Sequence, residues 1–221
     1  MLLTIRILIG IGLIAVLISQ CRKPWGWPGR LMARAMNRGH SALARWGLGH
    51  VTIEPGFRIL DIGCGGGRMV QTLSALAAQG TVVGVDYSRA CVAVSRATNA
   101  AGIAAGRVEV QEGSVSALPF PDAAFDLVTA VETHYYWPDL AANVREVLRV
   151  LKPGARFIII AELYKHRRHD VHSLVMKPLG GVVLTADEHR DLLSAGGYTD
   201  VAVETSKLGW ICAIGRRPSN R

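Results

Sequence analysis

Cysteine and aromatic residues are scarce in this chain of 221 residues, and its first fifty residues contain no acidic residue. The four cysteines are widely spaced and form no CxxC pair, so we expect neither a metal centre nor a disulfide framework. Aromatic residues make up only 6% of the sequence, and no segment is biased enough in composition to indicate disorder or a repeat array. Half of the residues are hydrophobic, which is enough for one catalytic domain with its own core.

Acidic residues are absent before Glu54, whereas seven basic residues precede it. The formal net charge of +8 therefore belongs to the N-terminal segment, because the remaining 18 basic and 17 acidic residues nearly cancel. A globular part this close to neutrality argues against a nucleic acid as the partner.

Residues 1–20 form an apolar stretch that only Arg6 interrupts. As a helix they would span roughly 30 Å, about the thickness of a hydrocarbon core. Basic residues and tryptophans follow at once, as at the cytoplasmic border of a membrane anchor. We therefore predict a membrane anchor with the enzyme on the cytoplasmic face. A buried or dimer-forming helix, an upstream start codon and a cleaved signal are the alternatives, and a signal lacks a small-x-small cleavage site.

Three parts of the chain are expected: the anchor in residues 1–20, a basic linker or lid in residues 21–50 and a catalytic domain in residues 51–221. His40 and Trp46 are candidates for the lid, and an ordinary amphipathic linker helix is the alternative.

Strands and helices are expected to alternate through the third part. The hydrophobic pattern predicts strands at residues 57–63, 81–87, 108–111, 125–132, 157–160, 200–205 and 210–214. It predicts helices at residues 69–79, 88–101, 138–151 and 186–195. The last two strands lie too close together for a crossover helix and should form an antiparallel hairpin. The fold class is therefore α/β, a doubly wound and mostly parallel seven-stranded sheet with a C-terminal hairpin and an N-terminal apolar helix.

A glycine-rich turn, DIGCGGGR at residues 61–68, follows the first strand. A dinucleotide fingerprint would need glycine at position 68 or 70, which hold arginine and valine. The pattern that fits is D-x-G-x-G-x-G, with Asp61 two residues before the first glycine. The spacing therefore argues against a pyrophosphate cradle.

This turn resembles motif I of the class I S-adenosylmethionine-dependent methyltransferases, in particular the methyltransferase type 11 group. Similar stretches occur in the family's order over about residues 51–215: VGVDYS at 83–88, EGSV at 112–115, LPFPD at 118–122, FDLV at 125–128 and LRVLKPG at 148–154. The resemblance implies S-adenosylmethionine as cofactor and the Rossmann-like sheet of that family.

The resemblance also assigns cofactor-binding residues. Asp61 and the turn glycines, Gly63, Gly65 and Gly67, would cradle the methionine part. Asp86 would accept hydrogen bonds from both ribose hydroxyls, a geometrically selective contact. The alternative for Asp86 is a helix N-cap beside Ser88.

The adenine end of the expected site is less regular. Tyr87 would flank the ring, and Val115 would offer its backbone N–H to it. Ser114 stands where the family commonly has an aspartate that accepts from the adenine amino group, so that contact is weakened or shifted. Glu132, after the fourth strand, is also expected beside the cofactor.

The segment ETHYYWP at residues 132–138 supplies the candidates for chemistry. The reaction would be an in-line displacement on the sulfonium methyl, for which alignment and exclusion of water are most important and a base is optional. His134 is a candidate base or substrate ligand, with Tyr135 beside it, and a packed or capping histidine is the alternative. As an alternative to carrying protons, Tyr135 would form an apolar wall together with Tyr136 and Trp137. The N/D-P-P-Y sequence of amide and adenine methyltransferases is absent, which argues against nucleic-acid bases as acceptors.

The expected acceptor is a small, lipophilic or membrane-associated molecule such as a quinone precursor or a lipid head group. An NAD(P)-dependent oxidoreductase and a noncatalytic S-adenosylmethionine-binding protein are the competing hypotheses. His166, His169 and His172 have the spacing of a metal triplet, but the basic residues among them would repel a cation, so a solvated or lipid-facing loop is preferred.

Overall fold

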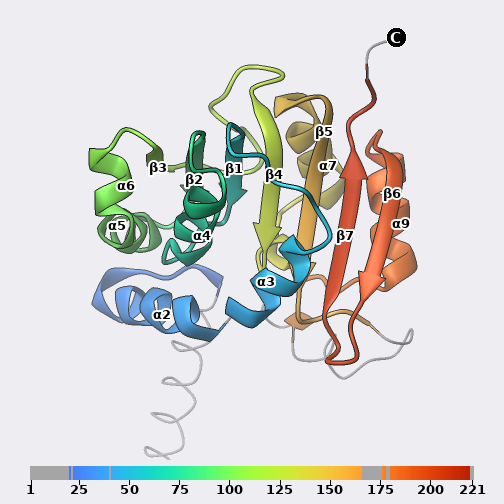
Figure 1. Cartoon of the computed structure of the whole chain (residues 1–221). Helices are drawn as coiled ribbons and strands as arrows, with labels where there is room; N and C mark the ends of the chain where they lie inside the picture. The colour runs from blue at the N-terminus through green and yellow to red at the C-terminus, as the bar shows by residue number, and fades with distance from the viewer. Residues whose placement is uncertain (1–19, 21, 40, 166–175, 178–179, 220–221) are drawn as a thin grey trace, which may run out of the picture.

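Seven described strands form one mixed sheet in the order β3-β2-β1-β4-β5-β7-β6 (Figure 1). A computed structural model describes residues 20, 22–39, 41–165, 176–177 and 180–219. The strands are β1 (Arg58–Ile62), β2 (Thr81–Asp86), β3 (Val108–Glu112), β4 (Phe125–Val131), β5 (Leu151–Ala161), β6 (Thr199–Thr205) and β7 (Ile211–Arg216). The first five pair in parallel, and β7 runs antiparallel to both β5 and β6. The predicted doubly wound sheet and its terminal hairpin are confirmed.

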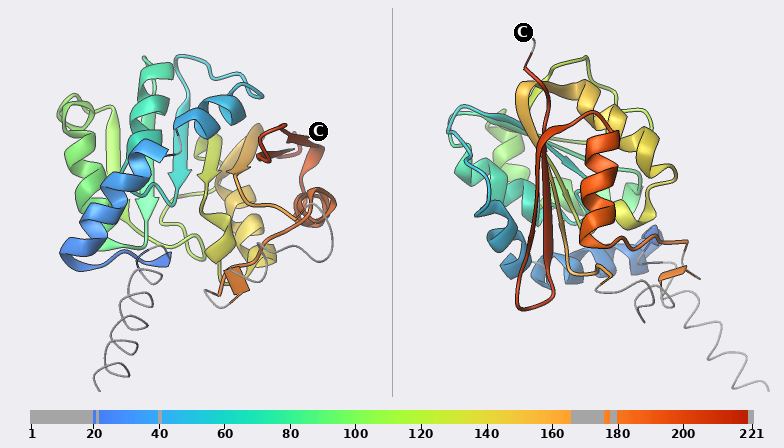
Figure 2. Two further views of the ribbon diagram at one scale, coloured as in Figure 1. Left: turned by 90° about the horizontal axis from the view of Figure 1, so that it is seen from below. Right: turned by 90° about the vertical axis from the view of Figure 1, so that its right-hand side faces the viewer.

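Helices cover both faces of this sheet. They are α2 (Gly26–Gly39), α3 (Ser41–Leu48), α4 (Arg68–Leu76), α5 (Arg89–Thr98), α6 (Ala100–Ala104), α7 (Leu140–Val150) and α9 (Ala186–Ala195), with a 3-10 turn η1 (His134–Tyr136). The right-hand view of Figure 2 shows α3 and α4 on one face, and α7 and α9 on the other. Each face has its own apolar core, and consecutive residues of the central strands, such as Ile59 and Leu60 or Ile158 and Ile159, point to opposite faces.

Two helix boundaries differ from the sequence prediction because side chains cap the helices elsewhere. The helix expected at residues 88–101 ends at Thr98, where the Asn99 side chain donates to the carbonyl oxygens of Gly67 and Ser95 at 2.9 Å each. The helix expected to open at residue 138 begins two residues later, because the Asp139 side chain accepts from the N–H of Ala142. The predicted cap at Ser88 is confirmed, since its hydroxyl accepts from the N–H of Cys91.

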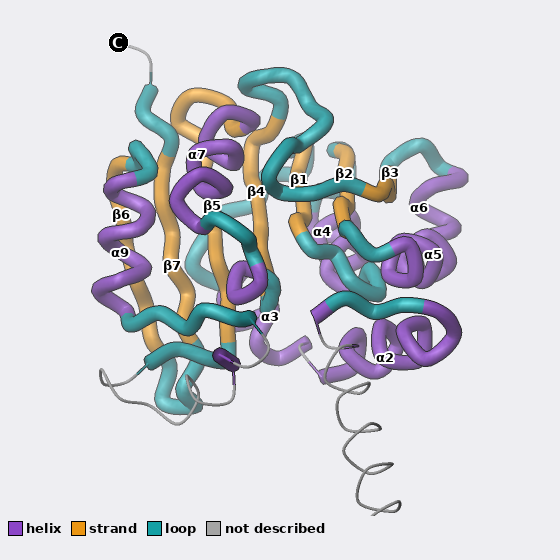
Figure 3. The backbone as a smooth tube through the Cα atoms, turned by 180° about the vertical axis from the view of Figure 1, so that it is seen from behind, coloured by secondary structure: helices purple, strands orange, loops and turns teal. Residues whose placement is uncertain are grey.

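The described part of the segment before β1 packs against the domain. Helix α2 lies beside α5 and across the carboxyl ends of the parallel strands, at the end of the sheet opposite the C-terminus (Figures 1 and 3). Residues 1–19 lie outside the described part of the chain, so the predicted anchor remains a prediction. Among the described residues, no helix is both long enough and apolar enough to cross a membrane.

Gly47 lets α3 approach β5, and its replacement should cost stability. A Cβ atom there would lie 2.5 Å from Cδ1 of the fully buried Ile160. We expect Gly47→Val to lower the free energy of unfolding by roughly 1–3 kcal/mol, as overpacking of a core does. Denaturant unfolding measures this, with Gly39→Val as the control because no atom lies within 4 Å of its Cβ position. Equal losses in the two variants would contradict this packing.

Candidate active site

A cavity of about 670 Å³ lies at the carboxyl ends of the parallel strands, where ligands of open α/β sheets bind. Its walls come from β1, β2 and β4, from the turns that follow them, and from α2, α3 and α4. The predicted cofactor residues that line it are Asp61, Gly63, Gly65, Asp86, Tyr87, Ser114, Val115 and Glu132. The structure thus brings these eight residues together around one cavity, whose size is typical of small-molecule sites.

The glycine turn is packed so closely that side chains would not fit. Gly63 has φ +72°, and a Cβ there would lie 2.2 Å from Oγ1 of Thr133. Gly67 has φ +83°, and its Cβ would lie 2.4 Å from Oγ of Ser95. Gly67 does not line the cavity; it is the N-cap of α4 and seats that helix against α5. The turn therefore holds its shape through contacts with the segment after β4 on one side and with α5 on the other.

Asn37 of α2 fastens the outer side of the same turn. Its Nδ2 donates to the carbonyl oxygen of Gly66 at 2.8 Å, and its Oδ1 accepts from the N–H of Arg68 at 3.2 Å. A Cβ at Gly66 would lie 2.4 Å from the carbonyl oxygen of Ala33, also in α2. The glycine turn is therefore clamped by α2, a helix that precedes it by about thirty residues.

Asp61 and Asp86 are buried carboxyl groups on neighbouring strands. Oδ1 of Asp61 accepts from the hydroxyl of Thr129 at 2.7 Å, and burial raises the pKa of Asp61 to about 7. Oδ2 of Asp86 accepts from the N–H of Gly65 at 2.9 Å, and Oδ1 from the N–H of Ser88 at 2.8 Å. Burial also raises the pKa of Asp86, while these two backbone bonds oppose the shift. Asp86 thus ties the glycine turn to the end of β2, and Ser88, not Asp86, is the helix cap.

Tyr87 continues from Asp86 along the cavity wall and is 38% exposed. Its hydroxyl donates to the carbonyl oxygen of Arg22, and Nζ of Lys23 lies 5.2 Å from its ring centroid. The neighbouring hydroxyl of Ser88 donates to the carbonyl oxygen of Pro24 at 2.5 Å. The segment before α2 is therefore held against the end of β2.

Ser114 and Val115 line the cavity after β3. Ser114 is exposed and its hydroxyl accepts from the N–H of Ser116 at 3.2 Å, whereas Val115 is buried. Neither carries a charge, so the acceptor that the family commonly has at position 114 is replaced here by a hydroxyl.

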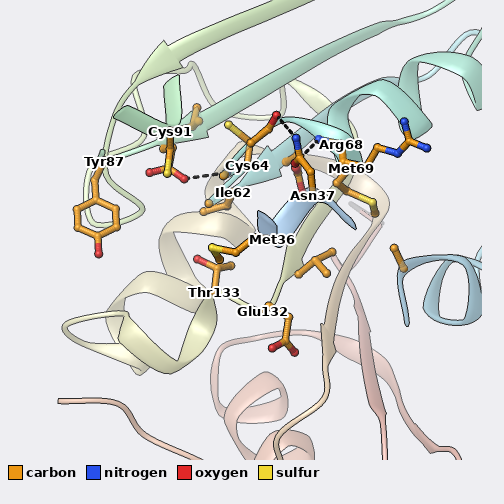
Figure 4. A pocket seen from close by; sticks show the side chains of 18 of the residues that line it. Met36, Asn37, Ile62, Cys64, Arg68, Met69, Tyr87, Cys91, Glu132 and Thr133 are labelled. Atoms are coloured by element: carbon orange, nitrogen blue, oxygen red, sulfur yellow. Dashed lines mark hydrogen bonds between the residues drawn. The ribbon is translucent and has the colours of Figure 1, made fainter. Parts of the chain in front are cut away.

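Glu132 stands at a different side of the cavity from Tyr87, next to Thr133 (Figure 4). Its backbone is left-handed, with φ +57°, and its N–H donates to the carbonyl oxygen of Ile160 at 3.0 Å. Oε1 accepts from the N–H of Glu162 at 2.5 Å and from the hydroxyl of Tyr135 at 3.0 Å. Burial raises the pKa of Glu132 to about 7, and the nearby charge of Glu162 adds to this rise.

The two predicted catalytic residues lie behind the cavity wall. Neither His134 nor Tyr135 lines the cavity, and both are almost completely buried. Nε2 of His134 lies 3.1 Å from Nε2 of His189 in α9, and the hydroxyl of Tyr135 accepts from the N–H of Leu163 at 2.9 Å. Their positions therefore give no support to contact with a substrate, and packing is the alternative that fits His134.

Two of the three residues expected to form the aromatic wall lie at the cavity, whereas Tyr135 does not. Tyr136 and Trp137 line the cavity, and Trp137 stacks on Phe157 with a centroid distance of 6.2 Å. Trp46 packs on Trp210, at 5.9 Å between ring centroids, and does not line the cavity. His40 and the triplet at 166, 169 and 172 lie outside the described residues, and the described residues hold no group of three potential metal ligands.

Charge around the cavity favours a cationic ligand. The buried carboxyl groups of Asp61 and Asp86 reach it from strand ends, whereas the arginines that line it are exposed. Buried carboxylates would repel a pyrophosphate and would stabilise a sulfonium or ammonium group. The geometry thus agrees with the spacing argument against a dinucleotide.

Several cavity residues could not be found from the motifs. Asn37, Met36 and Ser41 come from the segment before β1, and Thr133 touches the glycine turn from the segment after β4. Nothing in their local sequence indicates these contacts, which join positions 29 to 70 residues apart. The only signal was the general expectation that residues 21–50 include a lid.

Comparison with known proteins places this arrangement in one family. A family model described as a methyltransferase domain matches residues 60–159. The chain is similar to a ubiquinone/menaquinone biosynthesis C-methyltransferase of Geobacter sulfurreducens, with 36% identity over 70% of this chain and 69% of that protein. It is also similar to a demethylmenaquinone methyltransferase of Symbiobacterium thermophilum, with 38% identity over 48% of this chain and 43% of that protein. The chain spans about half the length of the first curated relatives that it matches.

Solved structures show the same fold. The chain resembles a Haloferax volcanii methyltransferase determined in complex with its Trm112 activator, with a TM-score of 0.78 and 20% identity over 88% of this chain and 96% of that one. A SAM-dependent methyltransferase of Aquifex aeolicus gives a TM-score of 0.71 at 19% identity, over 85% of this chain and 98% of that one.

The buried histidine pair should make stability depend on pH. Nδ1 of His189 lies 2.8 Å from the carbonyl oxygen of Thr185, so we place its proton there; His134 then donates through Nε2, and its own Nδ1 has no partner. Burial lowers the pKa of both rings, so the unfolded state binds more protons below its pKa of about 6.5. We expect the free energy of unfolding to fall as the pH drops below that value.

The measurement is denaturant unfolding between pH 8 and pH 5. We expect the free energy of unfolding of His134→Phe to depend less on pH than that of the wild type. Asp61 and Glu132 have raised pKa values and contribute in the opposite direction, so the difference between wild type and variant isolates the pair. The exposed His50, changed to Gln, is the control. An unchanged slope in His134→Phe would refute the effect.

Proposed function

Because this chain belongs to the class I S-adenosylmethionine-dependent methyltransferases, we propose that it transfers the cofactor's methyl group to a small lipophilic acceptor. The observation that carries the proposal is Asp86, a buried carboxylate that faces the cavity and is bonded to the glycine turn. S-adenosylmethionine is the cofactor of this family, and when bound it supplies an electrophilic methyl group on a sulfonium.

The residues around the cavity fit this cofactor. Asp86 would hold the ribose hydroxyls, since each of its carboxylate oxygens has a lone pair beyond its one backbone bond. The turn from Gly63 to Gly65 and the Asp61 carboxyl would receive the methionine part. Tyr87, Ser114 and Val115 would surround the adenine. These assignments rest on the position of each group along the wall of one cavity.

The acceptor is proposed to be a quinol or a similar hydroxylated ring with an apolar tail. The wall beyond Thr133 is formed by Tyr136, Trp137 and Pro138, which suits a flat apolar molecule. Relatives that methylate demethylmenaquinone and 2-phytyl-1,4-naphthoquinone, by their names, support this class of acceptor.

We further propose that the enzyme works at the cytoplasmic face of a membrane, with residues 1–20 as its anchor. Trp25, Trp27 and Leu31 are 58%, 75% and 54% exposed. Tryptophans and basic side chains together favour the interface of an anionic membrane. The basic residues of this surface are Arg22, Lys23, Arg30 and Arg34.

Calorimetric titration and a transfer assay test the proposed reaction. We expect the wild type to bind S-adenosylmethionine and S-adenosylhomocysteine but not NADH, and to move a labelled methyl group to demethylmenaquinol in detergent. Asp86→Asn should weaken cofactor binding about 10- to 100-fold, the effect of losing charged hydrogen bonds. Glu112→Gln, at the exposed end of β3, is the matched control. If the protein bound NADH and neither of the other two ligands, the proposed methyl transfer would be refuted.

Vesicle sedimentation tests the membrane proposal. The full chain should bind vesicles of phosphatidylcholine, and a chain starting at residue 21 should bind only when phosphatidylserine is added. The double change Trp25→Ser and Trp27→Ser should abolish that remaining binding, whereas Ile103→Ser on α6 should leave it intact. Equal sedimentation of the full and shortened chains with neutral vesicles would disprove the anchor.

A further inference from the structure

We propose that Glu132 is the general base that removes a hydroxyl proton from the acceptor, with Tyr135 and Glu162 as the residues that position it. This inference rests on the proposed function and adds the requirement that the acceptor carries an ionisable hydroxyl. It assigns to Glu132 the acid-base role that the sequence led us to expect at His134.

The side chain of Glu132 is fixed on one oxygen and open on the other. Oε1 accepts both the N–H of Glu162 and the hydroxyl of Tyr135. Within the described part of the chain, Oε2 receives no hydrogen bond, and the partly buried residue lines the cavity. One oxygen is thus available to a ligand, while the other keeps the carboxyl group in place.

The backbone of Glu132 is held in a conformation that costs free energy. A non-glycine residue at φ +57° is disfavoured by roughly 1–2 kcal/mol, and its N–H bond to Ile160 on β5 keeps it there. Strain of this kind collects at functional sites, because it aims a side chain where regular backbone would not. Here it places the side chain of Glu132 next to Thr133, in the wall of the cavity (Figure 4).

Two titratable groups face this carboxyl in the described structure, and they act in opposite directions. The Tyr135 hydroxyl, from η1, stabilises the carboxylate by donating to it, and Tyr135 keeps its own proton because burial raises its pKa well above the usual value. The charge of Glu162, just after β5, destabilises the carboxylate. The pKa of Glu132 is about 7, close to the optimum for a base at neutral pH.

With a quinol as acceptor, the reaction begins with removal of a hydroxyl proton. Its hydroxyl proton moves to Oε2 of Glu132, and the electron pair released into the ring forms the bond from the neighbouring ring carbon to the methyl carbon. The methyl–sulfur bond breaks, and its electron pair stays on sulfur. The ring carbon then loses its hydrogen to water as a proton, while Glu132 returns its proton to the oxygen and restores the quinol.

Glu132→Gln separates this role from cofactor binding. We expect its kcat for demethylmenaquinol to fall 10²- to 10⁴-fold, the usual contribution of a positioned base. Its calorimetric affinity for S-adenosylmethionine should change less than about twofold, which also shows that the variant is folded. Glu132→Asp should recover part of the rate. A variant that keeps its kcat, or one that loses cofactor affinity instead, overturns the proposal.

The pH profile gives a readout that a structural role would not move. In the wild type, kcat should rise tenfold per pH unit up to about pH 7 and then level off, and Glu132→Gln should lack this rise. Glu162→Gln should move the rise to lower pH, and Tyr135→Phe to higher pH. Shifts in the same direction overturn the proposal, whereas a wild type that binds no S-adenosylmethionine would refute the proposed function itself.

Discussion

The absence of a side chain at three glycines of the turn after β1 is the constraint on which the rest of the site depends. Gly63, Gly66 and Gly67 each lie within 2.4 Å, measured from a hypothetical Cβ, of an atom from a different element. Those elements are the segment after β4, the helix α2 and the helix α5. Because interiors are close-packed, a turn that touches three elements fixes them relative to one another. The positions of Asp86, Thr133 and Glu132 along the cavity follow from this arrangement.

The sequence predicted the sheet well because burial on both faces leaves a clear signal. Strands such as Val82–Val85 read as continuous apolar runs, and the short link between β6 and β7 excluded a crossover. Helix ends were less predictable. Asn99 ends α5 by bonding Gly67, thirty-two residues away, and no local pattern reveals such a contact.

The cofactor side of the cavity was also accessible from sequence, because its residues follow strand ends that meet at one edge. Asp61, Asp86 and Glu132 all reach the cavity as expected. The acid-base assignment was harder. Within η1 a step of one residue decides between the cavity and the core, so His134 turns towards His189 while Tyr136 lines the wall. The sequence alone does not specify which of these side chains points into the cavity.

The clamp from Asn37 to the glycine turn has a thermodynamic consequence. Its two hydrogen bonds join α2 to the backbone around Gly66 and Arg68, so docking of the helix and the shape of the turn are parts of one equilibrium. Linkage is reciprocal: any factor by which a docked α2 tightens cofactor binding is the factor by which the cofactor strengthens docking. A surface that holds the exposed Trp25 and Trp27, at the start of α2, would therefore act on cofactor affinity without touching the cavity. Attachment of the enzyme to a membrane and its binding of cofactor would then be coupled through the contacts of this segment, among them those of Asn37.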